Sequence, residues 1–186
     1  NYDPDGTYWV GGVWAPTNYM ITRGLMGAGR GEVAHEIATR YLAALEKTRQ
    51  KVEPHTLWEC YCPEADRPGH QAYTGKRVKP DFVGWTGLGP IAMLLENIIG
   101  VDMNAPRSHL TWDIRLTEKH GVNNFPIGNG HHADLLCQRR ESSDETAHIT
   151  VRSDSDLTVT VRRGDREQEI TVARGQKQVF RFGAEA

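Results

Sequence analysis

The spacing of apolar residues changes once along this chain, and that change limits what it can fold into. Between residues 15 and 100 the apolar side chains recur every three or four positions, which is the period of an amphipathic helix. From about Arg107 they alternate with polar side chains, which is the period of a strand with one buried face. The sequence therefore predicts a helical part over residues 1–106 and a small antiparallel β domain over residues 107–186.

Three helices are expected in the first part. The first follows Pro16, the second carries an apolar stripe over residues 33–45, and the third covers residues 88–99. Pro90 fits the first turn of the third helix, and Gly100 fits its C-terminal stop. A long loop over residues 53–83 separates the second and third helices, and a loop of that length is more often functional than idle.

The second part predicts short strands joined by tight turns. Alternating runs begin at Leu110, Ile149, Leu157 and Ile170, and Arg163-Gly164-Asp165 has the composition of a hairpin turn. Each helix of the first part must bury its apolar stripe, against this β unit or against helices from outside the chain. We favour helices from outside, because the chain has no initiator Met and looks like part of a longer protein. The expected fold class is mainly α with a C-terminal β unit.

The composition excludes several partners. The formal net charge is −2 over 186 residues, which favours neither a nucleic-acid binder nor a polybasic membrane segment. The longest apolar run, over residues 91–99, is interrupted by Glu96 and Asn97 and is too short to span a bilayer. We therefore expect no nucleic acid and no membrane among the partners.

Three cysteines occur, at Cys60, Cys62 and Cys137. Their number is odd and Cys-x-Cys is not a zinc spacing, so we interpret them as free thiols, which favours a reducing, cytoplasmic compartment. A disulfide from Cys137 to one of the other two is the alternative.

The long loop contains an acidic residue among aromatic rings, Trp58-Glu59 followed by Tyr61. Aromatic rings stack on the apolar faces of sugars, and a carboxylate among them can act as acid, base or nucleophile at an anomeric carbon. The pattern therefore indicates a site that cleaves glycosidic bonds. A surface position or a buried ion pair is the alternative for Glu59.

Four segments resemble, in the right order, motifs of the group of glycoside hydrolases that contains trehalase, processing α-glucosidase I and mannosylglycerate hydrolase. The resemblance covers residues 8 to 130. The segments are Tyr8-Trp9-Val10-Gly11-Gly12-Val13-Trp14, Trp58-Glu59-Cys60-Tyr61, Gly84-Trp85-Thr86-Gly87, and the pair His120-Gly121 with Phe125-Pro126-Ile127-Gly128.

The resemblance implies a fold, a mechanism and a set of site residues. It implies part of an (α/α)6 barrel of the six-hairpin glycosidase type, inversion at an α-linked bond, and Glu59 as the general base that activates water. The general acid would be an Asp that precedes this chain, so a missing N-terminal part of the barrel is the expected partner besides the carbohydrate substrate. No metal or organic cofactor is needed. The expected substrate-binding residues are Tyr8, Trp9, Gly11, Trp14, Asn18, Trp58, Tyr61 and Trp85.

Several positions depart from the group's pattern and leave the substrate open. Val10 stands where the group has Arg, Gly12 where it has Pro, and Cys60 where it has Asn. The substrate implied is a small saccharide or a glycosylglycerate-type compound. The alternatives are a non-catalytic carbohydrate-binding piece or a structural piece. Core packing is the alternative for Trp9 and Trp14, and a hydrogen bond near its own helix start is the alternative for Asn18.

Two other groups of residues are weaker candidates. Acidic residues of the loop could supply a second catalytic carboxyl, although a solvated loop explains them as well. They are Glu64, Asp66 and Asp81. Adjacent histidines on a strand point to opposite faces, so a metal site at His131-His132, with Asp134 and Cys137, is not expected. By the same rule Glu118 and His120 share a face and are interpreted as a polar pair.

Overall fold

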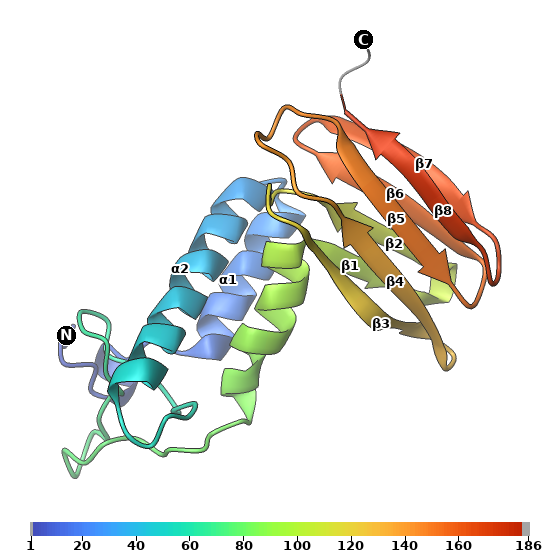
Figure 1. Cartoon of the computed structure of the whole chain (residues 1–186). Helices are drawn as coiled ribbons and strands as arrows, with labels where there is room; N and C mark the ends of the chain where they lie inside the picture. The colour runs from blue at the N-terminus through green and yellow to red at the C-terminus, as the bar shows by residue number, and fades with distance from the viewer. Residues whose placement is uncertain (1, 184–186) are drawn as a thin grey trace. The chain divides into compact units, whose positions relative to one another are not determined.

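A computed structural model describes residues 2–183 of the chain. It separates into two compact units, the first ending at Asn97 and the second beginning at Ile98 (Figure 1). Helices dominate the first unit and strands form the second, so the two periods of the sequence correspond to two folded parts.

The first unit contains the three predicted helices. A short 3-10 helix η1 (Tyr8–Val10) precedes α1 (Ala15–Gly27) and α2 (Gly31–Lys51). The third helix follows a 3-10 turn, η2 (Trp85–Leu88), and is a π-helix, η3 (Gly89–Ile99). The helical prediction for residues 15–100 is therefore confirmed at these three places.

The three helices pack through small residues and a polar link. The buried stripe of α2 includes Ala34, Ala38 and Tyr41. A methyl group at Gly89 would lie 2.7 Å from the Tyr41 ring, so only glycine lets η3 approach α2 this closely. On the other side, the Tyr19 hydroxyl of α1 donates to Glu96 of η3 at 3.1 Å.

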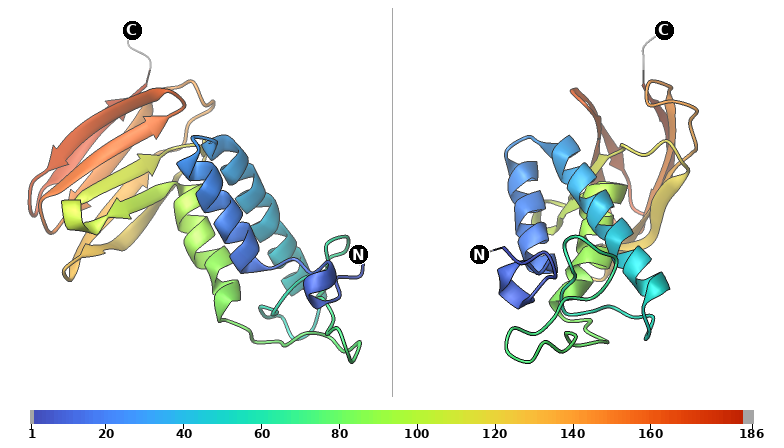
Figure 2. Two further views of the ribbon diagram at one scale, coloured as in Figure 1. Left: turned by 180° about the vertical axis from the view of Figure 1, so that it is seen from behind. Right: turned by 90° about the vertical axis from the view of Figure 1, so that its left-hand side faces the viewer.

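Residues 52–84 form the predicted long loop. Figure 2 shows this loop gathered with the N-terminal segment at one end of the three helices. The two segments that carry the candidate motifs therefore meet at this end of the helices.

The second unit consists of two four-stranded sheets. One has the order β1-β2-β6-β7 and the other β3-β4-β5-β8. A 3-10 turn, η4 (Ala105–Arg107), joins the first two strands. The strands are β1 (Val101–Asn104), β2 (His109–Asp113), β3 (His120–Gly128), β4 (His131–Cys137), β5 (Ala147–Ser153), β6 (Leu157–Arg163), β7 (Arg166–Val172) and β8 (Lys177–Phe182).

Alternation along the strands builds one apolar core between the sheets. Leu110 and Trp112 on β2 are fully buried, as are Val159 and Val161 on β6 and Ile149 on β5. The predicted hairpin at Gly164 joins β6 to β7, and its φ of +58° is one that glycine adopts without strain. The second unit therefore covers its own apolar faces.

The predicted fold class is wrong. Within residues 2–183 there are three helices of more than one turn and eight strands, so the chain is mainly β and not part of an (α/α)6 barrel. The prediction treated the β segment as a cap on helices, whereas the strands enclose a complete core of their own. The β unit is also not wholly antiparallel, because β2 pairs with β6 in parallel.

Among residues 2–183, no helix combines the length and the apolar character that crossing a bilayer requires.

Trp112 gives a test of the second core. Its ring is fully buried and its Nε1 donates to the Ile99 carbonyl at 3.0 Å. We expect Trp112→Ala to lower the free energy of unfolding by about 3–5 kcal/mol, measured by urea denaturation with far-UV circular dichroism. Val179→Ala is the matched control, because Val179 lies on the same unit and is 66% exposed, and its effect should stay within about 0.5 kcal/mol. Equal losses in the two variants would contradict this description of the core.

Candidate active site

Backbone hydrogen bonds hold the N-terminal segment against the long loop. The Val13 N–H donates to the Tyr61 carbonyl at 2.8 Å, and the Tyr61 N–H donates to the Val13 carbonyl at 3.0 Å. The Tyr8 N–H donates to the His70 carbonyl at 2.8 Å. Two segments that are far apart in the sequence are thereby fixed side by side.

The backbone of Tyr8 has an unusual conformation that its surroundings maintain. Its φ is +44°, a left-handed value that is uncommon for a residue with a side chain. The Gly12 N–H and the Trp14 Nε1 both donate to the Tyr8 carbonyl, at 2.9 and 3.1 Å. Strained residues of this kind persist where several contacts determine them, and they concentrate at functional sites.

These contacts direct the Tyr8 ring toward Glu59. The Tyr8 hydroxyl donates to Glu59 Oε1 at 3.1 Å. The Lys79 N–H points to Glu59 Oε2 at 3.4 Å, and the Glu59 N–H donates to the Lys79 carbonyl at 3.0 Å. The half-buried carboxylate of Glu59 is therefore held from both sides.

Glu59 and Tyr8 open into a cavity of about 330 Å³. The other wall of this cavity is a short loop that the sequence analysis did not select. The lining residues are Tyr8, Glu59, Gln71, Ala72, Tyr73 and Thr74. A cavity of this size suits a small ligand, and a lone aromatic residue in a polar stretch, Tyr73, was the signal that could have found this wall.

The Tyr8 phenol stays protonated at neutral pH. Partial burial raises the pKa of Tyr8 above its usual value of 10.0, and the hydrogen bond to Glu59 raises it further. A group whose pKa is raised on folding keeps its proton in the folded state beyond its usual pKa and loses it only as the pH rises through the raised value. The donor to Glu59 is therefore present at neutral pH and is lost only as the pH rises above 10.

The predicted tryptophan walls are not among the residues that line the cavity. Trp9 stacks on Trp14 with ring centroids 3.9 Å apart, and Trp14 meets Tyr8 edge-on at 4.8 Å. Trp14 is 2% exposed and Trp9 is 57% exposed. Trp85 is partly exposed and meets Trp14 at 5.8 Å. Trp14 therefore supports the ring of Tyr8 from behind, while Trp9 and Trp85 expose their rings outside the cavity lining.

The remaining predicted residues shape the backbone around Glu59. Trp58 and Tyr61 are buried, and the Trp58 N–H donates to the Tyr61 hydroxyl at 3.1 Å. The Asn18 side chain donates to the Trp14 carbonyl at 2.8 Å, which is the alternative that the sequence left open. Gly11 has a φ of +147°, and a methyl group there would lie 2.1 Å from the Asp3 carbonyl oxygen.

The other acidic residues of the loop bind elsewhere. Glu64 accepts a hydrogen bond from the Tyr2 hydroxyl at 2.6 Å, Asp66 pairs with Lys51, and Asp81 accepts from the Thr56 hydroxyl at 2.7 Å. Glu59 is therefore the one carboxylate that lines the cavity within the described part of the chain.

The cysteines and histidines also have definite places. All three cysteines are free and buried, and burial raises the pKa of Cys60 to about 12. His131 and His132 both approach Asp154, with Nδ1–carboxylate distances of 3.2 and 3.9 Å. Within residues 2–183, no group of three His, Cys, Asp or Glu side chains is arranged to hold a metal ion.

His120 and Glu118 are joined through the backbone. The ring Nδ1 of His120 lies 2.7 Å from the Glu118 carbonyl oxygen, so the link does not involve the Glu118 carboxylate. Burial lowers the pKa of His120. The ring is therefore a neutral part of the second unit at neutral pH.

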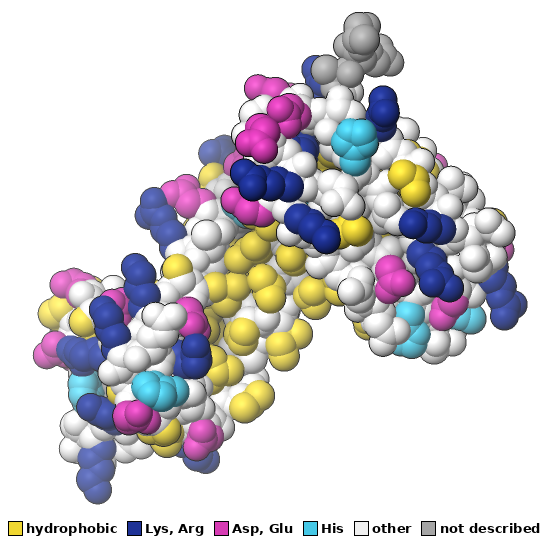
Figure 3. Space-filling view, viewed as in Figure 1, with side chains coloured by type: hydrophobic (Ala, Val, Ile, Leu, Met, Phe, Trp, Pro, Cys, Tyr) yellow, Lys and Arg dark blue, Asp and Glu magenta, His cyan; other side chains and the backbone are white. Residues whose placement is uncertain are grey.

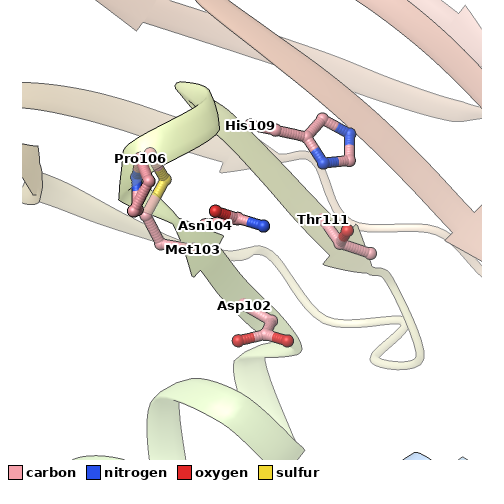
Figure 4. Close-up of a pocket in the computed structure, with 6 residues that line it drawn as sticks. All are labelled: Asp102, Met103, Asn104, Pro106, His109 and Thr111. Atoms are coloured by element: carbon pink, nitrogen blue, oxygen red, sulfur yellow. The ribbon is translucent and has the colours of Figure 1, made fainter.

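A second cavity, of about 380 Å³, lies on the second unit (Figure 4). Asp102 and Asn104 on β1 pair with Thr111 and His109 on β2, so their side chains share one face of the sheet. The His109 ring is held by the Thr160 hydroxyl at 2.8 Å. None of the sequence-predicted site residues lines this cavity.

Comparison with known proteins bears on the first unit. Residues 1–82 match the family model of the mannosylglycerate hydrolase MGH1-like glycoside hydrolase domain. The helical unit resembles a glycoside hydrolase domain. The resemblance inferred from the sequence is thus confirmed over these residues, and the match supports a glycosidase-type function for them.

One relative is similar over a longer part of the chain than the family model. An uncharacterized protein of Borreliella burgdorferi is 25% identical over 146 residues, which cover 74% of this chain and 30% of that protein. The chain thus spans about a third of the length of the curated relative it matches. No solved structure matches the chain.

Gly12 tests whether the Tyr8 turn holds the site together. A methyl group at Gly12 would lie 2.3 Å from the Tyr8 carbonyl oxygen. We expect Gly12→Ala to displace this turn and to lower the unfolding free energy of the first unit by about 1–3 kcal/mol in urea denaturation followed by tryptophan fluorescence. Gly27→Ala is the control, since nothing lies within 4 Å of the added methyl group. If Gly27→Ala lowers the unfolding free energy as much as Gly12→Ala, the close packing of the Tyr8 turn is contradicted.

The titration of Tyr8 tests its bond to Glu59. We expect Glu59→Gln to lower the pKa of Tyr8, because the amide removes the negative charge of Glu59, which contributes to the raised value. The measurement is an alkaline titration of phenolate absorbance, with the Tyr8→Phe variant subtracted to isolate this tyrosine. An unchanged midpoint would show that the two side chains do not interact in solution.

Proposed function

We propose that this chain carries the general-base half of a glycoside hydrolase active site, with Glu59 as the base. Glu59 takes a proton from water while that water attacks the anomeric carbon, and the configuration at this carbon inverts. The observation that carries the proposal is the cavity in which Glu59 is the one carboxylate, held by Tyr8. The glycoside hydrolase family match supports a glycosidic bond as the target.

The contacts of Glu59 suit a base. Each carboxylate oxygen can accept two hydrogen bonds. Oε1 accepts from the Tyr8 hydroxyl, and Oε2 faces the Lys79 N–H. Both oxygens retain capacity for a water molecule in the cavity. The two donors fix the carboxylate, and a fixed base within hydrogen-bond reach of its proton is what general-base catalysis requires.

The general acid comes from residues outside this chain. An inverting enzyme places its two carboxyl groups about 6.5–9.5 Å apart, on opposite sides of the scissile bond. The other acidic side chains of the loop, Glu64, Asp66 and Asp81, have partners away from the cavity. The relative from Borreliella burgdorferi is about three times as long as the part this chain matches, which leaves room for a second catalytic group.

The same outside residues are proposed to cover the helical unit. Figure 3 shows hydrophobic side chains gathered over helix η3. Ile91 and Leu94 of η3 are 61% and 38% exposed, and Met20 and Ile21 of α1 are 64% and 53% exposed. Exposed apolar groups of this kind mark surfaces that bind another part of a protein.

The substrate class follows from the same chemistry. We propose an α-linked O-glycosidic bond in a small saccharide or a glycosylglycerate-type compound. Hydrolysis of this bond uses water and two carboxyl groups, so the proposal requires no metal or organic cofactor.

Glu59→Gln in the full-length protein tests the base. We expect kcat on α-linked disaccharides and glucosylglycerate-type substrates to fall by about 10²–10⁴-fold, because the amide cannot take the proton from water. Glu64→Gln is the matched control, since Glu64 lies in the same loop but binds Tyr2, and its kcat should stay near that of the wild type. If Glu59→Gln keeps the kcat of the wild type, Glu59 is not the base.

A binding module is the second candidate function. It is favoured by the presence of one carboxylate, rather than two, at the cavity of the described residues. If the full-length protein binds sugars without hydrolysing any of them, and Glu59→Gln binds them equally well, the binding function holds and the catalytic one does not.

A further inference from the structure

A hairpin that the proposed mechanism does not use forms one side of the Glu59 cavity. The Gln71 N–H donates to the Lys76 carbonyl at 2.8 Å, and the Gly75 N–H donates to the Gln71 carbonyl at 3.2 Å. The Thr74 hydroxyl donates to Gln71 Oε1 at 2.9 Å. These three hydrogen bonds within the hairpin give it a defined shape.

The base of this hairpin is attached to the segment that positions Tyr8. The His70 carbonyl accepts the Tyr8 N–H at 2.8 Å, and the Val78 N–H donates to the Gly69 carbonyl at 3.1 Å. His70 also forms a strand-like bridge with Arg77. The tip of the hairpin and the carboxylate of Glu59 are therefore held on one backbone framework.

Tyr73 at this tip presents its ring to solvent. It is 101% exposed, more than any other large apolar side chain in the described residues. It nevertheless lines the cavity together with Tyr8 and Glu59. An exposed aromatic ring beside a candidate sugar-cleaving carboxylate is placed to stack on the apolar face of a sugar.

The charge of the lining favours a neutral ligand. Glu59 is the single charged residue of the six that line the cavity. A glycerate carboxylate would lie beside this anion with no cation among the lining residues to offset the repulsion. Sugar hydroxyls meet suitable partners there, because the lining offers the hydroxyls of Tyr8 and Thr74 and the amide of Gln71.

We infer that the site takes a neutral saccharide of at least two rings, with one ring beside Glu59 and the next stacked on Tyr73. This inference rests on the proposed function and narrows its substrate class. It selects the saccharide over the glycosylglycerate-type compound, and it assigns Tyr73 a role in substrate binding.

Binding measured without turnover tests the stacked ring. The probes are a panel of neutral α-linked disaccharides and the methyl α-glycosides of the same sugars, titrated calorimetrically into the full-length protein carrying Glu59→Gln. We expect an added Tyr73→Ala substitution to raise the Kd of the tightest-binding disaccharide about 10-fold. The same substitution should change the Kd of the methyl glycoside, which has no second ring, less than about twofold. Tyr73→Phe is the matched variant, because it keeps the ring, and it should bind like the parent.

Three results would contradict the stacking of a sugar ring on Tyr73. Tyr73→Ala could weaken the binding of both ligands equally, or it could weaken the binding of neither. The third result is that the parent, which carries Glu59→Gln alone, binds no disaccharide. In the wild type, we expect kcat/KM to be higher for at least one neutral disaccharide than for glucosylglycerate. The reverse order would overturn the neutral substrate class.

The outcomes for the base and for Tyr73 are separable. Disaccharide binding that depends on Tyr73, without turnover by the wild type, would reject the catalytic proposal and keep the stacked ring. Turnover that depends on Glu59, with Tyr73→Ala indistinguishable from the parent, would keep the catalytic proposal and reject the stacked ring.

Discussion

The candidate site depends on the pair of backbone hydrogen bonds that joins Val13 to Tyr61. These bonds, at 2.8 and 3.0 Å, tie the segment before α1 to the middle of the long loop. Glu59 lies two residues before Tyr61, and Tyr8 lies five residues before Val13, so the link brings the carboxylate and the phenol within hydrogen-bonding distance. The bond from the Tyr8 N–H to the His70 carbonyl, at 2.8 Å, is a second link between the N-terminal segment and the loop.

Glycines make this link possible because the backbones approach too closely for side chains. A methyl group at Gly6 would lie 2.8 Å from Cys62 Cα, and one at Gly69 would lie 2.7 Å from the Gly6 carbonyl oxygen. Gly11 is one of the residues that the sequence predicted to bind substrate. In the structure, Gly11 and Gly12 let the backbone approach other backbone, at Asp3 and Tyr8. The glycines thus determine how closely the N-terminal segment and the loop approach each other.

How much of the fold could be predicted differs between its elements. The helices and the strands β2, β5, β6 and β7 follow regular apolar spacing, and the sequence located them. Strand β1 alternates over only four residues and begins directly after a helix, and the alternation of β3 is interrupted by Asn123, Asn124 and two register shifts, so the sequence marks neither strand clearly. The fold class failed for a related reason, because sheet pairing such as β2 with β6 joins residues that no local pattern connects.

The sequence selected residues of the cavity lining where a motif marks them, and it missed those that only the folding of the loop brings there. Glu59 and Tyr8 carry recognisable motifs, whereas Gln71 and Thr74 are ordinary loop residues that reach the cavity because a hairpin folds back on His70. Burial also separates residues that the sequence grouped together. Trp14 and Trp58 lie in the interior, and only Trp9 and Trp85 keep exposed rings.

The strain at Tyr8 has a consequence for how a half-site can be useful. Its left-handed backbone is maintained by Gly12, Trp14 and His70 through bonds that lie wholly within the first unit. The orientation of Glu59 is therefore determined by contacts within the first unit. In an inverting reaction the base and the acid act on opposite sides of the sugar, so the two groups need a fixed separation but no contact. In the proposed mechanism, the first unit alone positions Glu59, and the residues outside this chain have only to place the acid at the correct distance.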